Sequence, residues 1–457
     1  MSEQRKIDVS RFVDEQKFSR FHVLIFVLCF LVVAMDGYDT AAIGYVAGSI
    51  SKDWNITRAA LGPVMSAALI GLGLGAFIGG PLSDKLGRKT VVVGSTLFFG
   101  IFSGLSTFAT TLDALTILRL LTGMGLGAAM PNSVALMAEF APSRVRSVTV
   151  NSQLVGFSAG LATAGALSAW LIPAHGWQSV FAVGGVVPLI FAVALIWLLP
   201  ESPQFLVMRG RPDAKIAKVL KRLAPTADLA NCTFTMSSQQ AGTRESRRWL
   251  ILSRDYRVGT LVLWVIYFAN LLVFYLLTGW LPILFRDAGF SLERAALVSS
   301  IFPIGGIIGA IAVGYVMDHL NPKIVIGVIY TIVAVMAVLI GQALTYPVVL
   351  GVMMFLTGAL ITSASTSLAT IAASYYSADC RSTGVSWMFT VGRFGAVFGT
   401  FLGASLTALG WKFGAVFALL AVPSVVAAAG LFILAKLTAA RDSRQVGHLN
   451  VKPDPQH

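Results

Sequence analysis

Two aspartates, Asp36 and Asp39, lie three residues apart in an apolar run that begins at Phe21. Helical spacing puts residues i and i+3 on one face, one turn apart. A charged side chain at the centre of a bilayer costs about 2.5–3.5 kcal/mol on insertion scales, so two acids on one face predict a functional role. Two neighbouring carboxylates repel, which favours protonation of one of them and suits proton binding. The alternative is that both acids lie in water at a helix end.

Two arginines also lie inside apolar segments, Arg119 and Arg393. We expect Arg119 to pair with carboxylates on neighbouring helices, and a purely structural ion pair is one open interpretation. The planar guanidinium of Arg393 suits a planar carboxylate in a bidentate, charge-assisted contact. The sequence therefore predicts that Arg393 receives a substrate carboxylate, with a fixed pair to a protein acid as the alternative.

A further set of polar side chains lies in the segment 258–284. Aromatic faces are combined there with polar tips, which suits an aromatic ring that carries a hydroxyl group; these residues are Tyr267, Asn270, Phe274, Tyr275 and Trp280. Trp280 alternatively belongs to the aromatic belt at a membrane surface. Asn270 and Tyr275, together with Asp39, are the candidates for substrate contact beside Arg393.

The elements that carry these residues are predicted membrane spans. The chain has 457 residues, of which 56% are hydrophobic and 12% are charged, whereas soluble domains carry about 25% charged residues. No alternating barrel pattern is present, so the spans are expected to be helices. Twelve apolar segments are long enough to cross a bilayer, near 21–49, 59–80, 91–109, 113–138, 147–172, 178–199, 258–284, 295–317, 324–344, 347–373, 383–409 and 412–436.

A polar stretch with eleven Lys and Arg residues, 200–257, separates the spans six to six. We therefore expect an all-α membrane protein with five parts: a cytoplasmic N-terminal tail at 1–20, a six-helix bundle at 21–199, a cytoplasmic basic linker at 200–257, a second six-helix bundle at 258–436 and a cytoplasmic tail at 437–457.

An internal repeat relates the two halves. Residues 80–89 (GPLSDKLGRK) align with 314–323 (GYVMDHLNPK) at an offset of 234, and Gly-Trp at 176–177 aligns with Gly-Trp at 410–411 at the same offset. A duplicated unit is how one class of transporters builds a midplane site between two rocking halves. The sequence predicts two pseudo-symmetric bundles with a central cavity between them.

Lys and Arg residues are distributed unevenly between alternate loops. If the N-terminal tail is cytoplasmic, 27 of the 34 Lys and Arg residues lie on the cytoplasmic side and five on the outer side. This excess predicts that both termini are cytoplasmic. The net charge of +13 is then a topology signal and an attraction to anionic lipid, and no nucleic-acid partner is expected. The three cysteines form no spaced cluster, so neither a metal site nor a disulfide framework is predicted, and no cofactor is expected.

Several motifs carry a resemblance to known transporters. G-x-x-x-D-K-x-G-R-K at 80–89 is similar to the loop signature of the major facilitator superfamily, and Pro-Glu-Ser-Pro at 200–203 fits it. Further stretches resemble the aromatic acid:H+ symporter family, and within it the 4-hydroxybenzoate/protocatechuate permeases: DGYDTAAIG at 36–44, LGPVMSAALIG at 61–71, RLLTGMGLGAAMPN at 119–132, TGVSWM at 383–388 and VGRFGA at 391–396.

This resemblance implies the major facilitator fold and proton-coupled import of a small aromatic carboxylate by alternating access. It also implies a multi-pass protein of a bacterial-type cytoplasmic (inner) membrane that functions as a monomer, with Arg119 taking part in proton coupling. Residues of the loop motif and its surroundings are expected to control a cytoplasmic gate: Gly80, Asp84, Gly87, Arg88, Glu139, Asp318 and Arg381. The second copy departs from the motif, with Asn321 and Pro322 in place of Gly-Arg.

Other functions stay open at this point. A carrier for gentisate, hydroxyphenylpropionate, benzoate or muconate would share these features, and a sugar or cation facilitator would share the loop motif. A cation carrier would not need Arg393 in its cavity. A sensor would usually add a large soluble output domain, for which 200–257 is short and polar. An enzyme would need a nucleophile–base or metal cluster, and the sequence has neither.

Overall fold

The structure is a computed structural model. Within the described part of the chain, twelve helices are long and apolar enough to cross a membrane, which confirms the predicted number of spans. The described residues are 5–225, 227–229, 232–236, 250–253, 256–376 and 380–449. Contacts divide the chain into two units, of which the first holds Met1–Gly242 and Thr278–Ser300 and the second holds Thr243–Leu277 and Ile301–His457.

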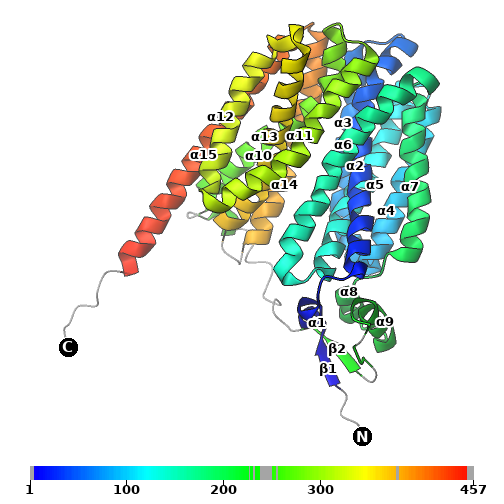
Figure 1. The fold of residues 1–457 in the computed structure, drawn as a ribbon, viewed down its shortest axis with the longest axis vertical. Helices are drawn as coiled ribbons and strands as arrows, with labels where there is room; N and C mark the ends of the chain where they lie inside the picture. Colours follow the sequence, from blue (N-terminus) through cyan, green and yellow to red (C-terminus); the bar gives the residue numbers. More distant parts are fainter. Residues whose placement is uncertain are drawn as a thin grey trace. The chain divides into compact units, whose positions relative to one another are not determined.

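The spanning helices follow one another along the chain (Figure 1). Those of the first half are α2 (Arg20–Asp53), α3 (Gly62–Leu86), α4 (Arg88–Leu105), α5 (Leu112–Phe140), α6 (Ser143–His175) and α7 (Gln178–Leu198). Those of the second half are α10 (Arg257–Asp287), α11 (Leu292–His319), α12 (Pro322–Ile340), α13 (Pro347–Tyr375), α14 (Arg381–Ala408) and α15 (Phe413–Leu449).

Helices α3 and α5 pack closely in the first unit because glycines lie at their contact. A Cβ on Gly75 would lie 1.9 Å from the Met124 carbonyl oxygen, and one on Gly123 would lie 2.1 Å from that of Ala68. Small residues let backbones approach where lipid provides no hydrophobic driving force between helices. The approach fixes α5, which carries Arg119 one turn before Gly123.

Helices α10 and α14 use the same device in the second unit. A Cβ on Gly395 would lie 2.2 Å from the carbonyl oxygen of Phe268, and one on Gly399 would lie 2.4 Å from that of Leu272. Gly395 lies two residues after Arg393 in the VGRFGA stretch, and Gly399 lies one turn further along α14. The packing therefore sets the position of Arg393 relative to the aromatic residues of α10.

The internal repeat has a counterpart in the helix ends. Gly176 ends α6 with φ +78°, and Gly410 follows the end of α14 with φ +71°. Both values lie in the left-handed region, which costs glycine nothing and commonly terminates helices. The copies differ at the start of α12, where the Asn321 side chain accepts the Lys323 N–H at 3.1 Å and Pro322 is the first helical residue.

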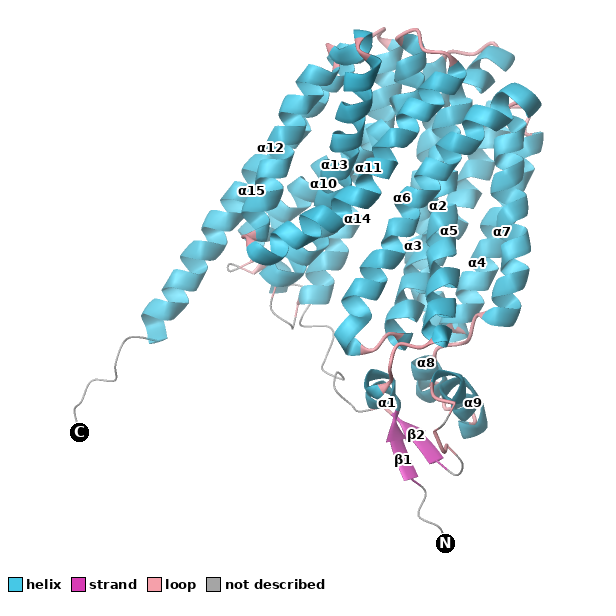
Figure 2. Cartoon of the chain, in the orientation of Figure 1, coloured by secondary structure: helices cyan, strands magenta, loops and turns pink. Residues whose placement is uncertain are grey.

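The tail and linker contain secondary structure that the sequence did not predict. Strand β1 (Arg5–Asp8) pairs in parallel with β2 (Cys232–Thr235), as the magenta arrows show in Figure 2. The tail also forms α1 (Val9–Glu15), and the linker forms α8 (Pro203–Met208) and α9 (Asp213–Leu223). Strands of four residues are too short for a recognisable alternation, and the partner of β1 lies more than 200 residues away.

The tail is also held at the start of α6. Asp14 accepts the Ser143 N–H at 2.8 Å and pairs with Arg146 at 3.0 Å. A carboxylate at a helix N-terminus is favourable because it satisfies free N–H groups and the helix dipole. The tail, the linker helices and the first six spanning helices therefore form one connected body.

Gly75→Ala is expected to destabilise the protein by about 1–3 kcal/mol, because the added methyl group overpacks against the Met124 backbone. Gly73→Ala on the same helix is the matched control, since nothing lies within 4 Å of a Cβ at Gly73. Thermal unfolding of both purified variants in detergent measures the effect. Equal Tm values for the two variants would contradict this account of α3–α5 packing.

Candidate functional site

A buried ion pair joins Asp39 of α2 to Arg119 of α5 in the first unit. Arg119 Nη2 donates to Asp39 Oδ2, and the Ser103 hydroxyl of α4 donates to Asp39 Oδ1 at 3.0 Å. Side-chain exposure is 1% for Arg119 and 3% for Asp39, so water screens the pair little. The partner of Arg119 is thus a carboxylate on a neighbouring helix, as the sequence predicts.

Helix α7 completes the surroundings of this ion pair. The Arg119 guanidinium carbon lies 5.1 Å from the centre of the Phe181 ring, a distance at which a cation is attracted to an aromatic face. The Tyr38 hydroxyl donates to the Val180 carbonyl at 2.9 Å and holds α2 against α7 next to Asp39. Ser103 and Phe181 were not predicted, because nothing in a serine or a phenylalanine of an apolar segment marks it as a neighbour of a charge.

The two charges of this pair compensate each other. A buried ion pair is stable only while both partners are charged, and removing one charge leaves the other uncompensated at a cost of several kcal/mol. Nε and Nη1 of Arg119 have no acceptor among the described residues, so the guanidinium has further N–H groups to offer. Asp36 lies one turn before Asp39 on α2 and is equally buried, with 2% exposure.

In the second unit, polar groups of α10 face α12, α13 and α14. Asn270 Nδ2 donates to Ser365 Oγ at 2.9 Å, and the Tyr330 hydroxyl donates to Asn270 Oδ1 at 2.8 Å. Asn270 is fully buried, whereas Arg393 on α14 and Tyr275 on α10 are partly exposed. The charge of Arg393 acts on the Tyr267 hydroxyl of α10, so the two groups lie in the same part of the second unit.

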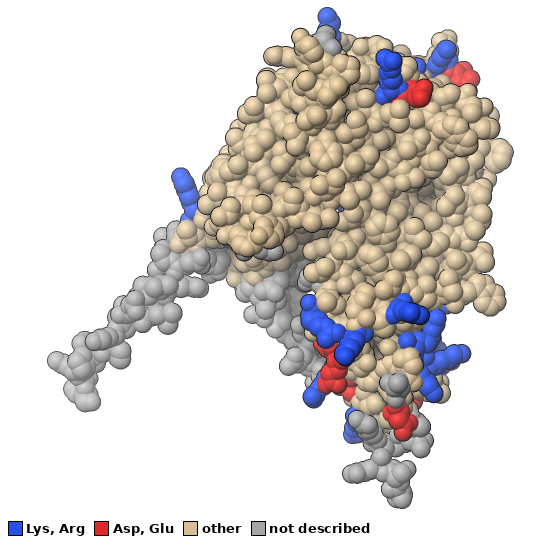
Figure 3. Space-filling view, viewed as in Figure 1, with Lys and Arg blue, Asp and Glu red and all other residues tan. Residues whose placement is uncertain are grey.

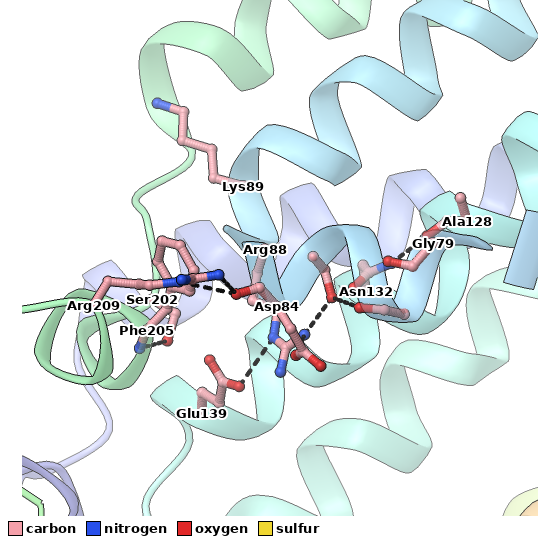
Figure 4. Close-up of polar contacts among 12 residues, drawn as sticks. Gly79, Asp84, Arg88, Lys89, Ala128, Asn132, Glu139, Ser202, Phe205 and Arg209 are labelled. Atoms are coloured by element: carbon pink, nitrogen blue, oxygen red, sulfur yellow. Dashed lines mark hydrogen bonds and ion pairs between the residues drawn. The ribbon is translucent and has the colours of Figure 1, made fainter. Parts of the chain in front are cut away.

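A polar cluster surrounds the turn between α3 and α4, and we call it the turn cluster: Ser83, Asp84, Arg88 and Glu139. Figure 4 shows Asp84, Arg88 and Glu139 of this cluster. Arg88 Nη1 donates to Asp84 Oδ1 at 3.0 Å and to Ser83 Oγ, and its Nε donates to Glu139 Oε1 at 3.3 Å. Asp84 is 68% exposed but Glu139 only 16%. The contact from α4 to α5 is therefore the better shielded of the two ion pairs.

Glu201 caps the start of α4. Its Oε1 accepts the N–H of Lys89 at 3.1 Å and that of Ser202 at 2.9 Å. Gly87, with φ +102°, is required between α3 and α4 because a Cβ there would lie 2.2 Å from Glu201 Oε2. Burial raises the pKa of the Glu201 carboxyl, and the N–H groups around it offset part of this effect.

Two cations lie at the carbonyl ends of helices beside this cap. Arg209 Nη2 donates to the Asp84 carbonyl at 2.7 Å, and Lys89 Nζ donates to the Ile196 carbonyl at 2.7 Å. Cations are favourable at helix C-termini, where carbonyls lack partners. Sequence reasoning missed both, together with the role of Glu201, because the partners are 107 to 125 residues away along the chain.

The remaining predicted gate residues are placed in part. The Gly80 carbonyl accepts the Ser83 hydroxyl at 2.8 Å, so Gly80 adjoins the turn cluster. Asp318 lies in the last turn of α11 and Arg381 begins α14, but both side chains lie outside what the structure describes. Their partners therefore stay a prediction.

Comparison with known proteins gives consistent results. The Major Facilitator Superfamily model matches residues 29–400 and 264–453. The chain is 45% identical to the 4-hydroxybenzoate transporter PcaK of Pseudomonas putida, over 94% of this chain and 96% of that protein. It is 44% identical to a gallate transporter of Pseudomonas putida, over 94% and 95% respectively.

Solved structures resemble the chain in fold. An inward-open structure of the xylose transporter XylE from E. coli has a TM-score of 0.72, with 17% sequence identity, and the match covers 90% of this chain and 95% of that chain. At this identity the likeness concerns the arrangement of helices alone.

Glu201→Gln is expected to change the pH dependence of stability. Because the folded state raises the pKa of Glu201, the folded protein keeps a proton that the unfolded chain releases, so wild-type stability falls as pH rises from the unfolded pKa of about 4.3. The amide retains an oxygen for the two N–H groups but does not ionise. The variant therefore does not lose stability in this way as pH rises.

The measurement is the difference in Tm, wild type minus Glu201→Gln, at a series of pH values. This difference should decrease from acidic to neutral pH. Glu15→Gln is the control, since Glu15 is 61% exposed and pairs only with Arg11 of its own helix. A difference that grows with pH, or the same decrease in the control, would contradict the assignment.

Proposed function

The chain belongs to the Major Facilitator Superfamily, and on that premise we propose that it imports a small aromatic carboxylate together with protons by alternating access. The chain is a transporter and not an enzyme. The relatives that it matches over most of their length are also transporters. The proposed substrates are hydroxylated benzoates such as 4-hydroxybenzoate or protocatechuate.

One observation carries the choice of an anionic substrate. Within the spans of the second half, charges other than Arg393 stand only at helix ends. Among the described side chains of the second unit, no Asp or Glu is available to pair with Arg393. An intramembrane cation needs a counter-charge, and a substrate carboxylate supplies it in the bidentate geometry that a guanidinium prefers.

The aromatic part of the proposal rests on α10 and on the relatives. Tyr267 and Tyr275 bring aromatic faces to the same unit as Arg393, and 4-hydroxybenzoate and gallate, which the related transporters are named for, are both hydroxylated benzoates. Tyr275 is the proposed direct contact to the ring. Asn270 and Asp39 are buried with partners of their own, so their proposed contact with the substrate requires a change of conformation or of protonation.

Proton coupling follows from the charge of the substrate. Moving an anion into a negative interior costs about 2.3 kcal/mol per 100 mV, and one accompanying proton cancels this cost. Asp36 and Asp39 are the proposed proton carriers. Protonation of Asp39 weakens its ion pair with Arg119. Loss of this ion pair changes the contact between α2 and α5, which couples proton binding to the conformational cycle.

The turn cluster is the proposed gate element of the first half. Its ion pairs from Arg88 to Asp84 and Glu139 join α3, α4 and α5, and such contacts hold one state and rearrange in another. Asp318 and Arg381 are the proposed counterparts in the second half. The distribution of Lys and Arg supports cytoplasmic termini in an inner membrane, and we propose that a monomer suffices.

Arg393→Gln is expected to raise the KM for 4-hydroxybenzoate about 10- to 100-fold, because a charge-assisted bidentate contact is worth about 1.5–3 kcal/mol. Arg393→Lys keeps the charge but not the planar fork and should recover only part of the affinity. Uptake of labelled 4-hydroxybenzoate into proteoliposomes measures both. Arg294→Gln, at an exposed position, is the control. A wild-type KM in Arg393→Gln, or uptake of sugars or quaternary amines in its place, would refute the proposed substrate class.

Asp36→Asn and Asp39→Asn are expected to abolish accumulation driven by a pH gradient while the protein stays folded in membranes, although Asp39→Asn should also lower its stability because Arg119 is left uncompensated. The amides keep the size of the side chain and cannot exchange a proton. Concentrative uptake with an imposed gradient is compared with exchange of internal for external substrate, which needs no net proton movement. Wild-type accumulation by either variant would exclude that aspartate as a proton carrier.

A further inference from the structure

Helix α9 carries a basic face that none of the transport chemistry uses. Its buried side is formed by Ile216, Leu220 and Leu223. At 100° per residue, Lys215, Lys218 and Arg222 fall within one arc of about 60°, which is turned away from this buried side, and all three are exposed. In Figure 3, Lys and Arg side chains gather at the lower end of the first unit, over α8 and α9.

Contacts of Arg222 show where this face points. The Arg222 guanidinium lies 4.6 Å from the centre of the Phe21 ring, and Phe21 belongs to the first turn of α2. Arg222 also lies close enough to Lys89 for the two charges to repel, and Lys89 belongs to the first turn of α4. The basic face of α9 therefore lies close to the first turns of the spanning helices α2 and α4.

Lys89 connects this face to the apolar surface of the bundle. Its Nζ donates to the Ile196 carbonyl in the last turn of α7, and the next residue, Trp197, is 79% exposed. An exposed tryptophan at the end of a spanning helix is typical of the boundary between head groups and acyl chains. The cations of α9 and α4 thus lie beside the lipid-facing end of α7.

Lys89 and Arg222 lie near one carboxylate, that of Glu201. Glu201 attracts Lys89, and its Oε1 also accepts N–H groups at the start of α4, so a single negative charge is shared by two cations and a helix cap. A phosphate that bridges Lys89 and Arg222 would remove the repulsion, and clusters of Lys and Arg beside spanning helices are the usual recognition feature for anionic lipids.

We propose that Lys89, Lys218 and Arg222 form a binding site for the phosphate of an anionic phospholipid, whose acyl chains lie along the end of α7 at Trp197. The bound lipid joins α9 of the linker to α2, α4 and α7. It thereby holds the linker against the first bundle independently of which substrate is transported.

Native mass spectrometry of the purified full-length protein, titrated with phosphatidylglycerol or phosphatidylcholine, tests the site. The wild type is expected to prefer phosphatidylglycerol. Lys218→Gln/Arg222→Gln should weaken phosphatidylglycerol binding about 5-fold for each charge removed and leave phosphatidylcholine binding unchanged. Lys218→Arg/Arg222→Lys keeps both charges and should bind as the wild type does, which separates charge from misfolding.

Lys52→Gln/Lys412→Gln is the matched control, because it removes the same charge at two exposed positions outside the cluster. Equal phosphatidylglycerol affinity in the two double Gln variants would overturn the site. Displacement of bound phosphatidylglycerol by inorganic phosphate at similar concentration would also overturn it, since the site would then recognise a soluble anion. Neither outcome depends on uptake of an aromatic acid, so the result is separate from the proposed function.

Discussion

The buried ion pair of Asp39 and Arg119 is the interaction on which the first unit depends. Taking two charges out of water costs several kcal/mol per ion unless geometry and further hydrogen bonds compensate. Here α4 supplies the Ser103 hydroxyl and α7 supplies the Phe181 ring. Four helices are thus constrained to meet at one point, and the close packing of α3 on α5 through glycine holds the arginine there.

The second unit has the same helical plan but a different charge content. Its spans carry one internal arginine, Arg393, and no internal acid. At the turn between α11 and α12, Asn321 and Pro322 stand in place of Gly87 and Arg88, and the Asn321 side chain caps the start of α12. The two halves therefore place their intramembrane charges differently: the first holds Asp36, Asp39 and Arg119, and the second holds Arg393.

The sequence predicted what local composition determines. Long apolar runs locate the twelve spans, and charges inside them identify Asp36, Asp39, Arg119 and Arg393, because an intramembrane charge is costly. The pairing of Arg119 with Asp39 rather than Asp36 was not predictable, since both acids share one helix face. It depends on how α2 and α5 pack.

Contacts between distant segments were beyond sequence reasoning for the same reason. Glu201 occurs in a recognised Pro-Glu-Ser-Pro segment, yet its role at the start of α4 follows from a backbone 112 residues away. Arg209 and the β1–β2 pairing are similar cases, because polar tails and linkers carry little periodicity. For Glu201 alone the sequence holds a signal, the glycine at position 87, where a Cβ would lie 2.2 Å from the Glu201 carboxylate.

The coupling of substrate to protons is the central claim, and one measurement tests it most directly. Proteoliposomes with a pH-sensitive dye inside, made permeable to potassium so that charge is compensated, receive 4-hydroxybenzoate outside with no imposed pH gradient. The account predicts acidification of the interior that exceeds the rate in protein-free liposomes and saturates with substrate. Protein-dependent entry of labelled 4-hydroxybenzoate without such acidification would contradict it.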